Sequence, residues 1–541
     1  MESPEIGAGR GSAPLLAWSD LAAMALLVVV ALWLRTPGLS TLGLYRDDAW
    51  PALATKASLS DALGMGVTTP GFELFLRTWL SVSQATPWAQ APALAAAILS
   101  IVGVYLLARR VGCERVAAMA AGGLLALAPI NVLFATRVKP YQFDALSTVA
   151  LIAAAVGVAE QPSSRRRWAV LMLVSVTSAV FSASTLAVSI SAVAWCAVLS
   201  VRRGRGRSRL LGTVLPVTYL ALVGAYATLV LGRVPPSLRT SWSGHYISAS
   251  TPAELVRTTT SVVGSFAAGV FPTNGVVAAL VLVVLALGAL WYRPPLAVLV
   301  MAPVLVALGL ALVHRAPFGG GRIDIYLYPC VALLAAMAIQ RILDTGHVPT
   351  GLAQVALAAA IVVYAATNGL EHVRANPYPA ADIGPLAAAV RARMEPGDAM
   401  VVGPFSRYPF ALYADSDPQV VMSPLYAPGF TVRSRDPDVL IMPAEFFEDG
   451  YDEDQAVRFA EGRARVWYLA TDTPESDTPG DVQAYEYRPE QRLLADGFEI
   501  VERIEGVGVH ADLLVRSPAG PGTGQDPPPT AVVASDASVR R

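Results

Sequence analysis

The sequence predicts a polytopic α-helical membrane protein that carries a smaller α/β domain at its C-terminal end. Hydrophobic residues make up 54% of the 541 residues and charged residues only 15%, whereas soluble globular chains carry about 25% charged residues. The apolar residues fall into long stretches, and about 20 apolar residues are enough to cross a bilayer as a helix. Charge and strand-like alternation become prominent only after residue 370.

About eleven stretches are long and apolar enough to be transmembrane helices. They cover residues 15–35, 90–108, 116–135, 142–159, 168–185, 186–201, 210–231, 275–292, 295–313, 322–341 and 351–369. The fifth and sixth are tight for two crossings. Residues 258–271 are apolar but short and interrupted by Ser, Thr and Gly. We therefore expect this segment to lie as a helix on the outer surface.

The placement of arginine predicts how these helices are oriented. Arginines follow the second, fourth, sixth, eighth and tenth stretches, at positions 109–115, 165–167, 202–209, 293 and 341. Loops rich in Lys and Arg stay in the cytoplasm. We therefore expect a multi-pass protein of the plasma membrane with a cytoplasmic N-terminus. The first stretch lacks a basic leader and is expected to be an uncleaved anchor.

The same orientation divides the chain into four parts. We expect a cytoplasmic N-terminus (1–14), a transmembrane domain (15–370) with its first outer loop at 36–89, an extracytoplasmic α/β domain (371–517) and a disordered tail (518–541) rich in Gly, Pro and Thr. In the third part, helix-like segments alternate with strand-like ones, which indicates an α/β domain. The strand-like segments are 399–402, 465–470, 498–503 and 511–516.

An acidic pair, Asp47-Asp48, lies just beyond the first apolar stretch. Charged residues this close to a bilayer are costly to keep and tend to mark function. Adjacent carboxylates face opposite ways in a strand and diverge by about 100° in a helix. We therefore expect one of them to act as a base and the other to orient its neighbour or bind a hydroxyl. The alternative is that the pair only caps a short helix beginning at Pro51.

Further polar clusters are expected at the same membrane face. They contain Thr69 and Glu73, then Arg137, Lys139 and Tyr141, and finally Arg322 and Tyr326. Cations beside a base at a lipid–water boundary fit a reaction whose leaving group is a lipid phosphate, because Arg and Lys stabilise the departing charge. His314 and Arg315 could add a phosphate contact. The alternative for these two is that they are interfacial loop residues near headgroups.

In this layout the chain resembles the GT-C superfamily of polyprenyl-phosphate-sugar-dependent glycosyltransferases, which includes the protein O-mannosyltransferases and the lipid A aminoarabinose transferase. The resemblance covers residues 15–370 in layout. Asp47-Asp48 resembles the family's acidic motif. Residues 69–72 are similar to its His-Pro-Pro-Leu loop but lack the His and the second Pro. Residues 137–141 resemble its Arg-x-x-Arg-Pro-Tyr motif with Lys at the second basic position, and residues 322–326 resemble a late Arg-x-x-x-Tyr signature.

The resemblance implies an inverting sugar transfer from a polyprenyl-phosphate donor to an extracytoplasmic glycan, lipid or protein. It implies Asp47 as the catalytic base beside Asp48, and Arg137, Lys139 and Arg322 at the donor phosphate, where His314 and Arg315 are the additional candidates. We expect Tyr141, Tyr326, Thr69 and Glu73 at the substrate. No cofactor and no nucleic-acid partner are expected. A divalent metal at the acidic pair stays open, but the neighbouring cations make it unnecessary.

Two other classes of protein stay open. One is a transporter or a flippase for lipid-linked glycans, and the other is an assembly protein without transferase activity. A transporter should show internal repeats and Gly/Pro-broken spans in matching halves, and no such repeat is evident. Its ionisable residues should also lie near the midplane rather than at one face. The discriminating observation is whether Asp47, Lys139 and Arg322 come together.

The orientation can be tested by labelling single cysteines in intact cells, in a background without Cys113, Cys196 and Cys330. A cysteine at position 205 should be protected from an impermeant reagent and one at position 450 should be labelled, because the arginine-rich loops are predicted to be cytoplasmic. Labelling at 205 together with protection at 450 contradicts the orientation.

Overall fold

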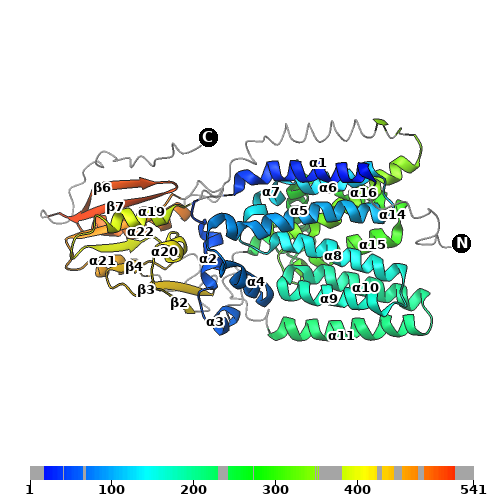
Figure 1. Ribbon diagram of the computed structural model, residues 1–541, viewed down its shortest axis with the longest axis horizontal. Helices are drawn as coiled ribbons and strands as arrows, with labels where there is room; N and C mark the ends of the chain where they lie inside the picture. The colour runs from blue at the N-terminus through cyan, green and yellow to red at the C-terminus, as the bar shows by residue number, and fades with distance from the viewer. Residues whose placement is uncertain are drawn as a thin grey trace.

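The computed structural model contains a helical bundle and, at one end of it, a smaller domain built on a β-sheet (Figure 1). The structure describes residues 17–39, 42–64, 69–229, 242–271, 273–347, 349, 351–352, 381–422, 429–443, 452, 454–472 and 481–517. The N-terminal helix lies along one side of the bundle. The short helices α2 (Arg46–Ala54), α3 (Leu59–Gly64) and α4 (Pro70–Leu80) lie where the bundle meets the sheet domain.

The bundle consists of long, mostly apolar helices that run along the long axis (Figure 1). They are α1 (Trp18–Arg35), α5 (Thr86–Arg110), α6 (Arg115–Leu127), α7 (Pro129–Leu133), α8 (Tyr141–Glu160), α9 (Arg165–Phe181), α10 (Leu186–Arg203), α11 (Arg207–Leu229), α13 (Pro252–Val270), α14 (Gly275–Tyr292), α15 (Pro294–Leu312) and α16 (Tyr328–Asp344). Short 3₁₀ turns connect or extend them: η1 (Thr36–Gly38), η2 (Phe134–Thr136), η3 (Ala183–Thr185), η5 (Ser243–His245) and η6 (Gly321–Leu327).

Within the described residues, eight helices are long and apolar enough to cross a membrane, or nine if the bent pair α6 and α7 is one span. These account for nine of the eleven predicted spans. The predicted span at 168–185 falls on α9, whose 17 residues lie at the short end of the range for crossing. The span at 351–369 lies almost wholly outside the described residues. The predicted surface helix is longer than expected, and α13 begins at Pro252.

Small residues let the helices of the bundle approach closely, as is usual in membranes. A Cβ added at Gly103 of α5 would lie 2.9 Å from Val149 Cγ1 of α8, and one at Gly122 of α6 would lie 2.6 Å from Leu27 Cδ1 of α1. Both glycines therefore define helix-to-helix contacts. The three cysteines are free and buried in the bundle, as expected of small apolar residues.

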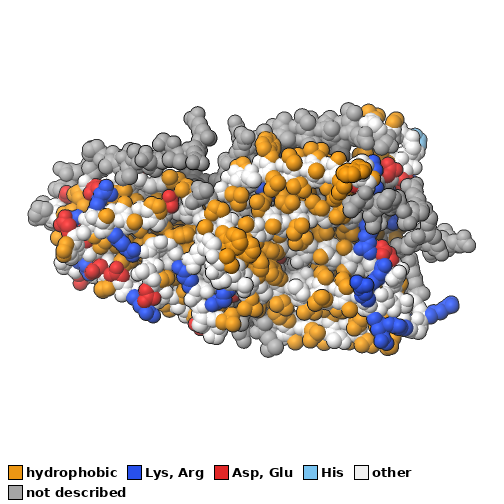
Figure 2. Space-filling view, viewed as in Figure 1, with side chains coloured by type: hydrophobic (Ala, Val, Ile, Leu, Met, Phe, Trp, Pro, Cys, Tyr) orange, Lys and Arg blue, Asp and Glu red, His pale blue; other side chains and the backbone are white. Residues whose placement is uncertain are grey.

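Basic side chains gather at the end of the bundle opposite the sheet domain (Figure 2). There Asp20 of α1 accepts hydrogen bonds from Tyr105 and Arg115 and pairs with Arg109 at 3.1 Å. Glu160 of α8 pairs with Arg110 at 2.9 Å. The predicted cytoplasmic arginines thus lie together at one end, away from the acidic pair of the first outer loop.

The C-terminal part folds around a five-stranded mixed sheet, in the order β4-β1-β5-β7-β6 within the described residues. β1 lies parallel to β4 and β5, and β7 is antiparallel to β5 and β6. The strands are β1 (Ala399–Val402), β4 (Val439–Ile441), β5 (Arg465–Thr471), β6 (Phe498–Gly506) and β7 (Val509–Arg516), with a separate hairpin of β2 (Pro418–Met422) and β3 (Phe430–Ser434). The predicted α/β character is confirmed, and the strand-like segments 498–503 and 511–516 fall in the antiparallel pair β6 and β7.

Helices cover both faces of this sheet. α19 (Ile383–Arg391) and α20 (Arg407–Tyr413) share one core with Trp467 and Leu513. α21 (Gln455–Phe459) and α22 (Asp481–Ala495) cover the other face, where Leu493 packs with Tyr468 and Leu514. Alternate residues of β5 and β7 therefore point to different helices, as the two-residue period of a strand requires.

The first outer loop shares a hydrophobic core with the sheet domain. This loop contains α2 (Arg46–Ala54), α3 (Leu59–Gly64) and α4 (Pro70–Leu80). Leu53 of α2 and Phe72 of α4 belong to the same buried cluster as Ile383, Phe410 and Leu412. Lys56 Nζ also donates to the carbonyl of Leu412 at 3.1 Å. The outer loop and the C-terminal domain are therefore packed as one unit.

Candidate functional site

The acidic pair lies in the first turn of α2, which begins at Arg46 after the extended residue Tyr45. The predicted helix start at Pro51 is therefore wrong by five residues, and the pair lies inside the helix. Carboxylates are favourable there, because the backbone N–H groups of a first turn carry partial positive charge. Successive helical side chains diverge by about 100°. As a result, 33% of the Asp47 side chain is exposed but only 1% of Asp48.

Asp48 is a buried carboxylate that links the first outer loop to the segment before α8. Its Oδ2 lies 3.1 Å from Arg137 Nε, and its Oδ1 accepts the backbone N–H of Val138 at 3.1 Å. Burial raises the pKa of Asp48, although Arg137 and Lys139 oppose this effect. Both oxygens are committed to the protein, so Asp48 positions the cationic segment rather than meeting a substrate.

Asp47 faces cations from separate parts of the chain. Its Oδ2 lies 3.2 Å from Arg322 Nη1 of η6, and Lys139 also acts on it electrostatically. Burial by itself would raise the pKa of Asp47, but Lys139, Arg322, Arg46 and Arg137 outweigh burial and hold the pKa well below its usual range. The two neighbouring carboxylates thus have opposite pKa shifts, a pattern typical of sites that assign them different roles.

Lys139 is the most strongly perturbed cation of the cluster. Its Nζ lies 3.9 Å from the ring centre of Trp50, one turn after Asp47 on α2. Burial lowers the pKa of Lys139 to about 7, against the opposing effect of Asp47 and Asp48. A lysine in this state gains a proton readily when a further negative charge arrives.

Aromatic rings back the other cations as well. Arg137 lies 5.4 Å from the ring centre of Tyr45, and Arg322 lies 5.5 Å from that of Trp242. Such cation–π contacts hold a guanidinium in place without neutralising it. Sequence reasoning missed Tyr45, Trp50 and Trp242. Trp50 could have been found, because a helical α2 puts it three residues from Asp47 and on the same face.

The two tyrosines that were predicted to bind the substrate take different positions. Tyr141 begins α8, packs edge-on against Phe134 at 5.4 Å between ring centres, and lies within electrostatic reach of Arg322 and Asp47. Tyr326 is buried in η6, where only 8% of it is exposed. Tyr141 therefore belongs to the cluster around Asp47, whereas Tyr326 is part of the buried core of the bundle.

The remaining predicted residues make their contacts elsewhere. The Thr69 hydroxyl donates to the carbonyl of Phe181. Glu73 is buried, and its Oε1 lies 3.9 Å from Nη2 of Arg77 on the same helix. His314 stacks on Tyr246 and meets the carbonyl of Ile247 at 3.1 Å, and Arg315 is exposed beside it. These contacts do not join any of the four residues to Asp47. In the described part of the chain, no group of three or more His, Cys, Asp or Glu residues could hold a metal ion.

The C-terminal domain also reaches this site. Arg46 stacks on Phe405 at 4.1 Å, and the backbone N–H of Leu44 donates to the Tyr413 hydroxyl at 3.3 Å. Phe405 is fixed in turn, because its N–H donates to the buried carboxylate of Glu486 on α22 at 2.5 Å. The residues on both sides of the start of α2 are therefore held by the sheet domain.

Comparisons with known proteins identify the fold. No family model matches the sequence, and no curated protein matches it. ArnT from Cupriavidus metallidurans bound to undecaprenyl phosphate is similar over 94% of this chain and 99% of that chain, with a TM-score of 0.50 and 11% identity. The apo structure of the same ArnT is similar over 94% of this chain and 100% of that chain, with a TM-score of 0.51 and 11% identity. The oligosaccharyltransferase of Archaeoglobus fulgidus is similar over 89% of this chain and 72% of that chain, with a TM-score of 0.49 and 12% identity. The chain therefore shares its fold with ArnT.

The buried link at Asp48 makes a prediction about stability. Asp48→Asn should lower the free energy of unfolding by about 3–5 kcal/mol, because it leaves Arg137 as a buried charge without its partner. Asp47→Asn should lower it by less than about 1 kcal/mol, because that pair is partly exposed. Thermal unfolding of the purified chain in nanodiscs measures both. Equal losses for the two variants contradict the assignment of Asp48 as the buried link.

Proposed function

We propose that this protein is an integral-membrane glycosyltransferase that moves a sugar from a polyprenyl-phosphate donor to an extracytoplasmic acceptor. The observation that carries the proposal is the partly exposed carboxylate of Asp47 among Arg322, Lys139 and Arg137, which come from separate segments. The fold shared with ArnT, whose structure contains undecaprenyl phosphate, supports a donor of this class. The acceptor is a glycan, a lipid or a protein of the cell envelope.

In this proposal the sugar is transferred in one inverting displacement. Asp47 takes the proton of an acceptor hydroxyl while that oxygen forms a bond to the anomeric carbon of the donor. The bond between that carbon and the phosphate oxygen breaks, and the electron pair leaves with the lipid phosphate. Lys139 and Arg322 stabilise the charge that develops on the phosphate. General-base help of this kind contributes about 10²–10⁴-fold to the rate.

The ion pair between Asp47 and Arg322 suggests how donor binding prepares the base. In the free protein the cations hold the pKa of Asp47 too low for an effective base. A donor phosphate brings negative charge that competes for Arg322 and Lys139. Losing these partners raises the proton affinity of Asp47. The donor therefore binds first and activates the carboxylate that then receives the acceptor proton.

The location and the division of labour are part of the same proposal. The N-terminus and the arginine-rich loops face the cytoplasm, and residues 371–517 lie outside, on the side of Asp47. The C-terminal domain covers the site and orients the acceptor, while the span-bounded segments perform the chemistry. A transporter or flippase is not favoured, because Asp47, Lys139 and Arg322 come together beside the segment that contacts the sheet domain rather than at the middle of the bundle.

Replacing the base tests the mechanism. Asp47→Asn should leave the chain folded and reduce sugar transfer by about 10²-fold or more, because the amide cannot accept the acceptor proton. The control is Asp61→Asn, which changes an exposed carboxylate of the same loop. Membranes containing each variant are supplied with radiolabelled polyprenyl-phosphate sugars, and products are identified by mass spectrometry. More than a tenth of wild-type turnover in Asp47→Asn would show that Asp47 is not the base.

The pKa of Lys139 makes a second prediction. The donor phosphate binds better when Lys139 is protonated, and the pKa of Lys139 is about 7. The kcat/KM for the donor should therefore fall as the pH rises above about 7, with a slope that approaches tenfold per pH unit. Lys139→Arg should abolish this alkaline fall because Arg stays charged. Initial rates between pH 6 and 9 measure both. If kcat/KM falls over the same alkaline pH range in the wild type and in Lys139→Arg, Lys139 does not bind the donor phosphate.

A further inference from the structure

The sheet domain contains a polar hollow at one end of the interface between α22 and the sheet. Elsewhere this interface is apolar, with Leu493 packed against Tyr468 and Leu514. Toward the β6–β7 turn, the same face of β7 carries His510 and Asp512 instead. Ionisable groups are expensive to bury in such an interface. Their presence here calls for a function beyond packing.

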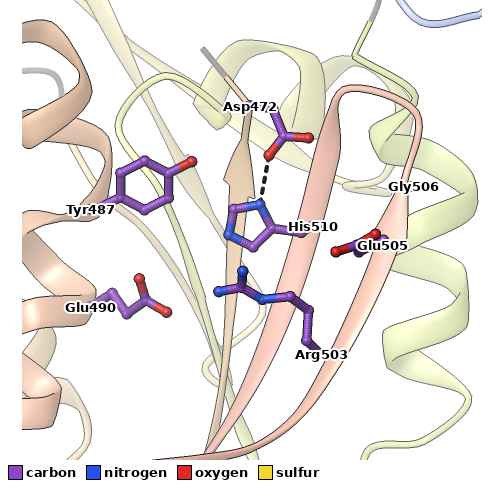
Figure 3. Close-up of a pocket in the computed structure, with 7 residues that line it drawn as sticks. All are labelled: Asp472, Tyr487, Glu490, Arg503, Glu505, Gly506 and His510. Carbon is purple, nitrogen blue, oxygen red and sulfur yellow. Dashed lines mark hydrogen bonds and ion pairs between the residues drawn. The ribbon is translucent and has the colours of Figure 1, made fainter. Parts of the chain in front are cut away.

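The groups around the hollow are held in place by one another. Arg503 makes two hydrogen bonds to Asp512, at 2.6 and 2.5 Å. His510 Nδ1 lies 2.8 Å from Asp472 Oδ1, and the ring of Tyr487 stacks on His510 at 5.7 Å between ring centres. Figure 3 shows Asp472, Tyr487, Arg503 and His510 turned toward a common space between α22 and the sheet. The walls of the hollow are therefore preorganised.

Two buried polar atoms in this wall have no hydrogen-bond partner among the described residues. They are Nε2 of His510 and Oε1 of Glu490, in side chains whose residues are only 5% and 6% exposed. Leaving a buried polar atom without a partner costs about 1–3 kcal/mol. The nearest charged oxygen to His510 Nε2 is Asp512 Oδ2 at 3.9 Å, beyond hydrogen-bond distance, so a ligand hydroxyl that reaches His510 would satisfy this nitrogen.

The hollow has the size of a small ligand. Its volume is about 290 Å³, at the lower end of the range of about 300–1,000 Å³ that is usual for small-molecule sites. Asp472, Tyr487, Glu490, Arg503, Glu505 and His510 line it. This volume suits one or two sugar rings and is too small for a lipid chain or a folded segment of protein.

The charges of the lining select against anions. Asp472 and Glu505 are carboxylates at the rim, and the guanidinium of Arg503 is occupied by Asp512. Burial, together with a hydrogen bond to Asp512, raises the pKa of Glu490 well above its ordinary value, so Glu490 adds little negative charge. Arg503 is paired with Asp512, and the two rim carboxylates leave the lining with net negative charge, which disfavours a phosphate or a carboxylate.

The hollow lies next to the candidate active site. Asp472 also lines a smaller cavity together with Tyr45, Arg46 and Phe405, directly before Asp47 on α2. The N–H of Asp472 donates to Gly508 O in the β6–β7 turn at 2.9 Å. This smaller cavity has a volume of only about 10 Å³, so the hollow adjoins the segment that precedes Asp47 but is not connected to it by an open passage there.

We propose that this hollow is a subsite for a neutral sugar unit of the acceptor. The proposal rests on the proposed function and narrows it, because the acceptor is then a glycan or glycoconjugate whose bound unit carries no phosphate or carboxylate. The carboxylates of Asp472 and Glu505 accept sugar hydroxyls, His510 Nε2 and Glu490 complete the hydrogen bonds, and the Tyr487–His510 stack forms one wall.

Sugar binding can be measured without any donor. The full chain in lipid nanodiscs, free of sugar-headed detergent, is titrated with the methyl glycosides of mannose, galactose and arabinose and with glucuronate and glucose 6-phosphate, using saturation-transfer NMR. At least one neutral glycoside should bind at millimolar concentration, and the two anions should not. The double variant Asp472→Asn/Glu505→Gln should weaken this binding roughly tenfold. His510→Ala should abolish it.

Controls separate loss of the subsite from loss of the fold. Asp472 and Glu505 are largely exposed, so the double variant should keep the wild-type unfolding temperature. Glu461→Gln, an exposed change before β5, should bind sugars as the wild type does. An absence of binding by any neutral glycoside, equal binding of the anions, or unchanged binding by the double variant overturns the subsite, even where donor turnover is present. Failure of the proposed function shows instead as absent donor turnover beside intact sugar binding.

Discussion

The candidate site depends on one buried interaction, in which Asp48 holds Arg137 and the N–H of Val138. It joins the first outer loop to a segment about ninety residues later in the chain. Because Asp48 and Asp47 are neighbours on α2, fixing one carboxylate toward the interior fixes the direction of the other. The same interaction places Lys139 two residues beyond Arg137, where it acts on Asp47. One ion pair thus positions both the proposed base, Asp47, and a cation of the proposed donor site.

The site is then completed from two sides. From the bundle, η6 brings Arg322 to Asp47, with Trp242 behind the guanidinium. From the sheet domain, Glu486 holds Phe405, and Phe405 holds Arg46. The shared core of α2, α4, α19 and α20 gives these contacts a rigid support. Preorganised charges of this kind are what stabilisation of a transition state requires, because no reorganisation is needed during the reaction.

Much of this arrangement could be predicted from the sequence, and the reasons differ between its parts. Spans such as 275–292 are visible because a bilayer imposes a length and a composition on any helix that crosses it. The common location of Asp47, Lys139 and Arg322 followed from one-sided arginines and from loop order. The helix start at Arg46 was missed because Tyr45 caps it without any side-chain hydrogen bond. The partners Phe405 and Trp242 were missed because they are far away in the chain, and contacts between distant segments leave no local pattern. The subsite residues were missed because Asp472, Glu490 and His510 lie on three separate elements that only the folded sheet brings together.

The core shared by the first outer loop and the C-terminal sheet domain has a consequence for how such chains can be divided. Judged by sequence, the two segments belong to different domains and are separated by more than 300 residues. Judged by packing, Leu53 and Phe72 are as much a part of the sheet domain as Phe410 is. A chimaera that takes its C-terminal region from another protein would therefore place foreign side chains against α2 and α4. The unit that can be exchanged intact is discontinuous in the sequence: it contains α2 and α4 together with the residues after 380.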